Sequence, residues 1–181
     1  MAEFGANYPC FCQDGASKTG VVLGKLVSAN LTVNLASGEL YADDGLAEQI
    51  SEFASGSIAM ETDDLSDDNA EAIYGCDVTE SVVTYNKDDT PPMGKLGYYK
   101  VLMRSGVKYY KAVFHPRVRA ALGNDNAQTK GSSITFQTTN TTFTVFADDS
   151  GNWRKTKTCA TAEEAKTWLN TQCNITVTPG G

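Results

Sequence analysis

Histidine is almost absent from this 181-residue sequence, in which His115 is the only one. A hydrolase of the Ser-His-Asp type needs its histidine beside a nucleophile and a carboxylate, and the chain contains no nucleophile-elbow pattern. The glycines form no phosphate-binding loop, because Gly20, Gly24 and Lys25 have the wrong spacing. The sequence therefore predicts no catalytic residue and no cofactor, and we expect the protein not to be an enzyme.

Long apolar runs are also lacking. No stretch approaches the roughly 20 consecutive apolar residues of a membrane span. The first five residues have neither the basic nor the apolar region of a signal peptide. We expect a protein that is made in the cytoplasm and contacts no membrane.

Metal-binding patterns are incomplete. Cys10 and Cys12 are too close for a zinc knuckle, and no second Cys or His pair completes one. The acidic segment Asp63–Asn69 resembles a calcium loop but lacks its central glycine and terminal glutamate. We expect no metal site. We also expect the five cysteines to remain thiols, with Cys10 and Cys12 exposed or half-buried.

Charge is abundant but unevenly distributed, with a net charge of −7. Residues 39–89 hold fifteen acids and one base, whereas residues 95–130 hold eight bases and one acid. One interpretation is two solvated faces. The other is a subunit whose acidic surface meets the basic surface of a second copy, a contact that propagates into rings and stacks. The sequence pI near 4.7 argues against tight nucleic-acid binding.

Strand patterns dominate the chain. From Val27 to Leu35 apolar and polar residues alternate strictly, which predicts a strand with one dry face. A turn at 36–39 and a second turn at 43–45 are expected to follow, with an extended segment over 47–62. A long hairpin is predicted from Leu96 to Phe114, turning at Ser105-Gly106. Further strands are expected at 81–85, 133–147 and 153–156.

Two short helices are also predicted. Ser66 and Gly75 have the residue types of an N-cap and a C-cap around one of them. Thr161 and Glu164 form a capping box before the other, whose predicted buried stripe is Ala165, Trp168 and Leu169. We expect residues 1–20 to be an arm without regular structure, 21–173 to form one β-domain, and 174–181 to be a tail.

The order of several segments resembles the major tail proteins, or tail tube proteins, of siphophages and related prophages. The segments that carry the resemblance are Leu31–Leu35, Glu39–Gly45, Phe53–Ile58, Leu65–Asp68 with the helix ending at Gly75, Tyr109–Val113, Thr129–Thr138, Trp153 and Ala162–Leu169. The resemblance spans roughly residues 21–169. The Cys10–Cys12 segment is not a feature of that family.

The resemblance implies a mainly β fold of the tail-tube type, a sandwich or barrel of two packed antiparallel sheets with one or two short α-helices. It further implies hexameric rings of this chain that stack into a hollow tube through which DNA passes during ejection. The partners would be other copies of the chain, the tape measure protein, and the tail terminator and distal tail proteins. The protein would reside in the virion tail after assembly in the host cytoplasm.

These considerations select two residue sets. Acids would repel DNA phosphates and are expected at the lumen or at one end of each ring. Bases are expected to engage an adjacent subunit. The acidic set is Asp43, Asp44, Glu48, Glu52 and Glu61; the basic set is Lys100, Arg104, Lys108, Lys111, Arg117 and Arg119. The alternative function is a β-sandwich module of a phage that binds carbohydrate or a host receptor through exposed Trp and Tyr.

Overall fold

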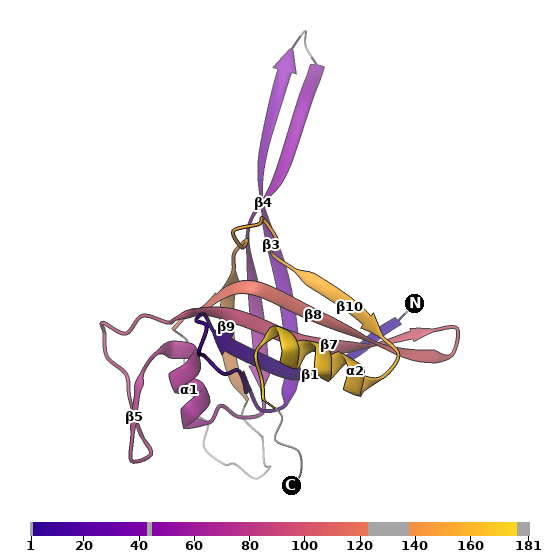
Figure 1. Cartoon of the computed structure of the whole chain (residues 1–181). Coiled ribbons are helices and arrows are strands. Elements are labelled where there is room, and N and C mark those ends of the chain that lie inside the picture. The colour runs from indigo at the N-terminus through magenta and orange to yellow at the C-terminus, as the bar shows by residue number, and fades with distance from the viewer. Residues whose placement is uncertain (1, 43–44, 123–137, 177–181) are drawn as a thin grey trace, which may run out of the picture.

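The computed structural model describes residues 2–42, 45–122 and 138–176, which form a mainly β fold of two antiparallel sheets and two helices (Figure 1). This confirms the fold class predicted from the sequence. The elements are β1 Ala2–Gln13, β2 Val21–Val22, β3 Leu26–Ala42, β4 Gly45–Thr62, α1 Asp67–Tyr74, β5 Asp77–Thr79, β6 Val82–Thr84, β7 Met93–Arg104, β8 Val107–Ala120, β9 Thr139–Val145, β10 Lys155–Cys159 and α2 Ala162–Gln172.

The larger sheet has eight strands and divides at β8. Its strand order is β2-β1-β7-β8-β9-β4-β3, and β10 also pairs with β8. One edge of β8 pairs with β7, while the other pairs first with β10, over 110–114, and then with β9, over 118–120. Pro116 lies between these two segments and has no amide hydrogen to donate to a ladder. The strand therefore passes from one layer of the fold to the other at this point.

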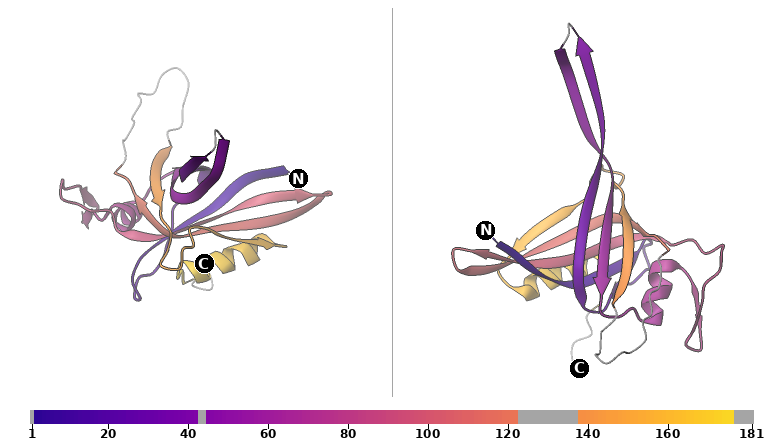
Figure 2. Two further views of the ribbon diagram at one scale, coloured as in Figure 1. Left: turned by 90° about the horizontal axis from the view of Figure 1, so that it is seen from above. Right: turned by 180° about the vertical axis from the view of Figure 1, so that it is seen from behind.

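The two layers enclose the main core. Strands β3, β4 and β9 run across β1, β7 and β8, as two views from opposite sides show (Figures 1 and 2). Buried side chains from both layers meet there, and Ile73 and Tyr74 of α1 join them from one end. The buried residues of this core include Phe11, Ile58, Met60, Leu96, Tyr98, Val113, Val118, Phe143 and Val145.

A second core lies between β1, β7, β8 and β10 on one side and α2 on the other. Ala165 and Leu169 of α2 are fully buried in it, as predicted, whereas Trp168 is half-buried and packs edge-on against Phe114. The order of layers is thus β3-β4-β9, then β1-β7-β8-β10, then α2.

The predicted helix caps are confirmed. The Asn69 amide donates to Ser66 Oγ, and Gly75 has the left-handed φ of 71° that suits a C-cap. At α2 the Glu164 amide donates to Thr161 Oγ1, and the Glu164 carboxylate accepts from the Ala160 amide. The capping box is therefore present, with its return bond one residue earlier than expected.

The expectation of an N-terminal arm is wrong for residues 2–13. They form β1, which pairs with β7 from Ala2↔Met103 to Gln13↔Gly94 and contributes Phe11 to the main core. Two register shifts interrupt the ladder, and Tyr8 has a positive φ of 59°. These irregularities remove the strict alternation by which a strand is recognised in a sequence.

The expected turn at 36–39 is also wrong. Strand β3 continues through Gly38 to Ala42 and pairs with β4 as far as Ala42↔Gly45. Continuous pairing along the partner strand overrides the local turn preference of Ser37 and Gly38. The predicted 96–114 hairpin is present but longer, because β7 begins at Met93 and β8 ends at Ala120. Strand β10 begins at Lys155 rather than at Trp153, and residues 133–137 of the strand expected at 133–147 lie outside the described residues.

Candidate assembly surface

The most prominent surface feature is a two-stranded ribbon that extends beyond the body of the fold (Figures 1 and 2). It consists of β3 and β4 outward of residues 33 and 56, because Gly56 is the last β4 residue that also pairs with β9. Within the described parts of the chain, no third strand pairs with this outer half. Both of its edges therefore present unpaired backbone amides and carbonyls, which are templates for further strand pairing.

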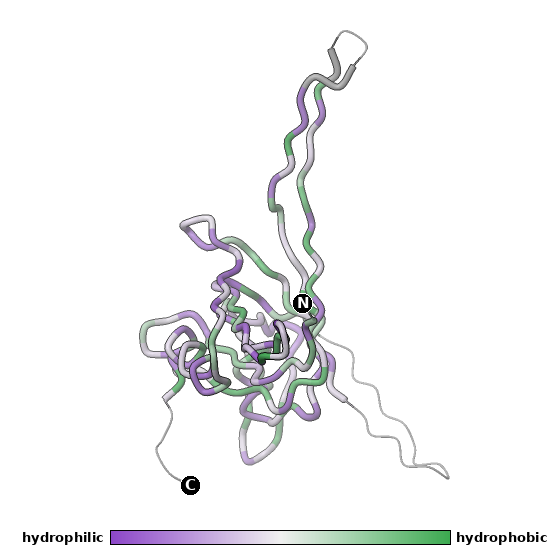
Figure 3. Tube along the Cα trace, turned by 90° about the vertical axis from the view of Figure 1, so that its right-hand side faces the viewer, coloured by the Kyte–Doolittle hydropathy of each residue, from purple (hydrophilic) through white to green (hydrophobic). Residues whose placement is uncertain are grey.

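The ribbon carries exposed apolar side chains on both faces. Leu35 is 61% exposed and lies on the face that continues from the main core, as its alternation with Leu31 requires. Leu40 and Ile50 are 57% and 63% exposed and lie on the opposite face. Hydropathy alternates along both strands of the ribbon (Figure 3). A ribbon that is apolar on both faces needs neighbours on both faces to leave water.

The base of the ribbon has a different surface, which we call the polar face. Cross-strand partners share a face of a sheet, so the register of β3, β4 and β9 identifies its members. They are Ser28, Asn30, Thr32 and Asn34 of β3, Ser55, Ser57, Ala59 and Glu61 of β4, and Asn140, Thr142 and Thr144 of β9. The opposite side of these strands holds buried Ile58, Met60, Phe143 and Val145. This three-stranded layer therefore buries one side and presents an uncharged or acidic surface on the other.

The predicted acidic residues separate into two places. Glu61 lies on the polar face, where it accepts hydrogen bonds from Ser28 Oγ at 3.3 Å and from Thr138 Oγ1. Glu48 and Glu52 are exposed on the outer ribbon, opposite Leu40 and Ala36. All three point to the same face of β4, as their cross-strand partners show. Asp43 and Asp44 lie outside the described residues.

Two of the predicted bases face each other in a polar groove. Lys100 of β7 is the register partner of Lys111 of β8, and both reach the carboxylate of Glu3, at 3.3 and 3.7 Å. The hydrogen bond from Lys100, with the charges of both lysines, lowers the pKa of Glu3. Arg154 lines the same groove, which lies between β3 and strands β7, β8 and β10.

Arg154 was not among the residues predicted from the sequence. No acidic residue stands next to it in the sequence, and it precedes a strand. No sequence pattern therefore distinguishes it from a base that is simply exposed to solvent. In the fold its guanidinium lies over the Trp153 ring, 5.1 Å from the centroid. With Lys100 and Lys111 it gives the groove three positive charges, and the two lysines contact the carboxylate of Glu3.

The other predicted bases lie elsewhere. Arg104 and Lys108 are exposed at the tip of the β7–β8 hairpin, beside the Ser105-Gly106 turn. Arg119 is exposed at the border of the polar face, opposite Thr144 of β9. The six bases of the predicted set therefore form no single patch.

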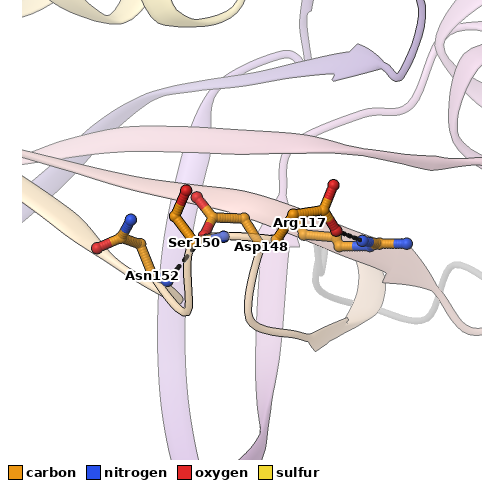
Figure 4. Close-up of polar contacts among 5 residues, drawn as sticks. Arg117, Asp148, Ser150 and Asn152 are labelled. Carbon is orange, nitrogen blue, oxygen red and sulfur yellow. Dashed lines mark hydrogen bonds and ion pairs between the residues drawn. The ribbon is translucent and has the colours of Figure 1, made fainter.

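Arg117 pairs within its own chain (Figure 4). Its Nη1 lies 3.1 Å from Asp149 Oδ1, in the loop between β9 and β10. The next acid, Asp148, accepts hydrogen bonds from the amides of Ser150 and Asn152, which lowers the pKa of Asp148. Arg117 thus borders the β9–β10 loop, which the hydrogen bonds to the Asp148 side chain hold in place.

His115 is fully buried where β8 changes partners, between the rings of Tyr98 and Trp153. Its Nδ1 lies 3.1 Å from the Trp153 carbonyl oxygen, which can only accept, so Nδ1 carries the proton. Nε2 has no hydrogen-bond partner among the described residues. Burial lowers the pKa of His115 to about 4, so the ring is neutral near pH 7. In this fold the ring has no exposed surface and packs between two aromatic rings.

The cysteines contradict one expectation. All five are free thiols, as predicted, and all are buried, so the expectation that Cys10 and Cys12 are exposed or half-buried is wrong. Four of them, Cys10, Cys12, Cys159 and Cys173, belong to the core beneath α2. Among the described residues, no group of three or more His, Cys, Asp or Glu side chains is placed to hold a metal ion.

Each tryptophan packs against another aromatic ring. Trp153 is covered by Phe53 on one side and approached by Arg154, and Trp168 packs against Phe114. No described helix is both long and apolar enough to cross a membrane. The exposed surfaces that stand out are therefore the ribbon, the polar face and the basic groove.

Comparison with known proteins adds no family. No family model matches the chain, and no curated protein is similar to it.

Proposed function

We propose that this protein is a structural subunit of a phage tail tube, which assembles with copies of itself into stacked rings around a DNA-conducting lumen. The observation that carries the proposal is the β3–β4 ribbon. A two-stranded ribbon with exposed apolar residues on both faces is marginally stable in water by itself. Assembly that buries both faces of the ribbon and pairs both of its edges would remove the exposed apolar surface and the unpaired backbone groups.

The polar face fits the role of a lumen lining. It runs over β3, β4 and β9 and, apart from Arg119 at its border, contains no base. A surface of hydroxyl, amide and carboxylate groups offers DNA phosphates little attraction, so DNA can slide along it. Glu61 lies on this face and would be the acidic lumen residue of the predicted set. Glu48 and Glu52, farther out, suit the end of a ring.

The charges provide a means for copies to recognise each other. Glu48 and Glu52 are exposed on the ribbon, and Lys100, Lys111 and Arg154 gather in the groove at its base. An acidic projection and a basic recess on one subunit are complementary between copies. A contact between two different surfaces of this kind repeats indefinitely, as a tube requires. The function is thus structural, with self-association in place of catalysis.

The experiment is electron microscopy of the purified protein at high concentration, compared with a variant carrying Leu35→Asp and Ile50→Asp. We expect hollow tubes or rings for the natural sequence and none for the variant, because charge on both ribbon faces opposes their burial. Circular dichroism should show that the variant stays folded, since both residues lie outside the core.

A matched control is Val82→Asp in the separate β5–β6 hairpin, where the side chain is 60% exposed. This variant should assemble as the natural protein does. Normal tubes from the Leu35/Ile50 variant would contradict the role of the ribbon. A natural protein that stays monomeric at all concentrations and instead binds glycans would favour a carbohydrate-binding module.

A further inference from the structure

Two buried thiols from opposite ends of the chain are in contact. Cys10 lies in β1, and Cys173 is the residue that caps the C-terminal end of α2. Their Sγ atoms are 3.6 Å apart, and neither residue has any exposed surface. A disulfide bond requires an approach of about 2.05 Å, so a closure of roughly 1.5 Å, spread over two side chains, would join them.

The surrounding residues hold this pair in place. Cys10 Sγ also lies 3.4 Å from the Gly97 carbonyl oxygen of β7. A Cβ atom at Gly97 would lie 3.0 Å from Cys10 Sγ and 2.8 Å from Leu169 Cδ2, so the glycine leaves room for the thiol beneath α2. The other neighbouring thiol, Cys12, points instead to the carbonyl oxygens of Gln13 and Lys18. Of the four thiols in this core, Cys10 and Cys173 are the two that a hydrogen bond joins.

We propose that Cys10 and Cys173 are an oxidation site, at which a peroxide converts the two thiols into a disulfide bond between β1 and α2. One thiolate attacks a peroxide oxygen to give a sulfenic acid and releases hydroxide, which takes up a proton to become water. The second thiolate attacks the sulfenic sulfur, forms the S–S bond and displaces the oxygen as a second water. The two thiols lose two protons and two electrons, and one hydrogen peroxide takes these up and is reduced to two waters.

The packing predicts that this reaction is slow. The hydrogen bond with Cys173 and burial both raise the pKa of Cys10, so little thiolate is present near neutral pH. Peroxide is small, and brief opening of the last turn of α2 would expose the pair. The rate should therefore increase with pH and with conditions that loosen the end of α2.

The bond would change the stability of the fold. It would close a loop that contains almost the whole chain, since the two residues are 163 positions apart. Cross-linking such a loop restricts the unfolded chain strongly, and we expect the midpoint of thermal unfolding to rise by roughly 5–10 °C.

The experiment treats the folded protein with hydrogen peroxide, removes the peroxide, alkylates the remaining thiols in denaturant and maps the peptides by mass spectrometry. We expect two of the five thiols to disappear and a cross-link to join the peptides that contain Cys10 and Cys173. Cys10 and Cys12 fall in the same tryptic peptide, because no Lys or Arg precedes Lys18. A Cys12→Ala variant resolves the assignment, since it should keep the cross-link and the thermal shift.

Cys10→Ala should lose both the cross-link and the thermal shift, and Cys76→Ala, in the other core, is the control that keeps them. Five thiols remaining after treatment would overturn the proposal. A cross-link to Cys12 or Cys159, or sulfinic acid at Cys10 without a cross-link, would do the same. If the Cys10 variant does not fold, the peptide maps of the natural protein and of Cys12→Ala still show whether Cys10 and Cys173 are cross-linked.

Discussion

Phe53 and Trp153 stack face to face, with ring centroids 4.6 Å apart and planes within 5° of parallel. Phe53 belongs to β4 at the point where the ribbon leaves the body, and Trp153 immediately precedes Arg154 and β10. Both rings pack against the main core as partly buried members. This stack joins the ribbon to the body outward of the last β4–β9 pair.

Replacing Phe53 should therefore loosen the base of the ribbon. We expect Phe53→Ala to lower the free energy of unfolding by about 1–3 kcal/mol, since a half-buried aromatic ring and a stacked pair are lost. Phe53→Leu keeps most of the apolar volume and should cost less. Denaturant unfolding followed by circular dichroism measures both, and equal losses for the two variants would contradict a contribution from apolar volume.

The exposed hairpin tip offers a sharper test of charge docking than the paired bases do. Lys111 and Arg117 already contact Glu3 and Asp149, so reversing them also disturbs the monomer. Arg104→Glu with Lys108→Glu should prevent tube formation and leave the monomer folded, as judged by microscopy and circular dichroism. Lys87→Glu, in an exposed loop, is the control and should still assemble.

Adding bases to the polar face should make it retain DNA. Asn30→Lys with Thr142→Lys places two cations on exposed positions of this face. We expect assembled variant protein to bind duplex DNA about tenfold more tightly at low salt, and the gain to vanish as salt rises. Thr79→Lys with Thr84→Lys, on exposed positions of the β5–β6 hairpin, adds the same charge elsewhere. Equal DNA retention by the two variants would argue against a lumen role.

Stability should fall in acid because of His115. The folded-state pKa of about 4 lies below the usual value of 6.5, so between these values the unfolded chain binds a proton that the folded chain does not. Stability is therefore full above pH 6.5 and is lost as pH falls toward 4, by an amount on the order of 3 kcal/mol. His115→Phe keeps an aromatic ring between Tyr98 and Trp153 but cannot take up that proton. Urea unfolding between pH 4 and 7 should show a smaller decline for this variant, and equal declines would contradict the assignment.

The α2 capping box provides a local test. Thr161→Ala removes the acceptor for the Glu164 amide and should cost about 1 kcal/mol of unfolding free energy. Thr167→Ala, at an exposed position inside the helix, is the matched control and should change stability by a few tenths at most. Thermal unfolding of the two variants under identical conditions should show the larger loss of stability for Thr161→Ala.

Features with a local physical cause could be predicted from the sequence. The caps at Ser66, Gly75 and Thr161 depend on bonds within a few residues, and the turn at Ser105-Gly106 depends on two positive φ angles. Features that depend on distant partners could not. Strand β1 is held by β7, about 90 residues away, and its bulges conceal the alternation. The continuation of β3 through Gly38 likewise comes from its pairing with β4.

For the candidate surfaces, too, local features could be predicted from the sequence and features that depend on distant partners could not. Charge counts selected Glu48 and Glu52 as surface acids, and both side chains are exposed on β4. The basic groove could not be foreseen, since Lys100, Lys111 and Arg154 meet only when β8 pairs with both β7 and β10. The contact between Cys10 and Cys173 joins the two ends of the chain, and no spacing rule reaches that far.

The division of β8 has a mechanical consequence. One strand carries the pairing of both layers, with β10 and α2 toward its start and β9, followed by the ribbon strands, toward its end. Tension applied to the ribbon therefore enters the body by two routes: through β9 into the backbone of β8, and through the Phe53–Trp153 stack into the segment before β10. In a long polymer of such subunits, bending strain on the first route would concentrate around Pro116, between the segments of β8 that pair with β10 and with β9, and the buried ring of His115 beside it would resist that strain.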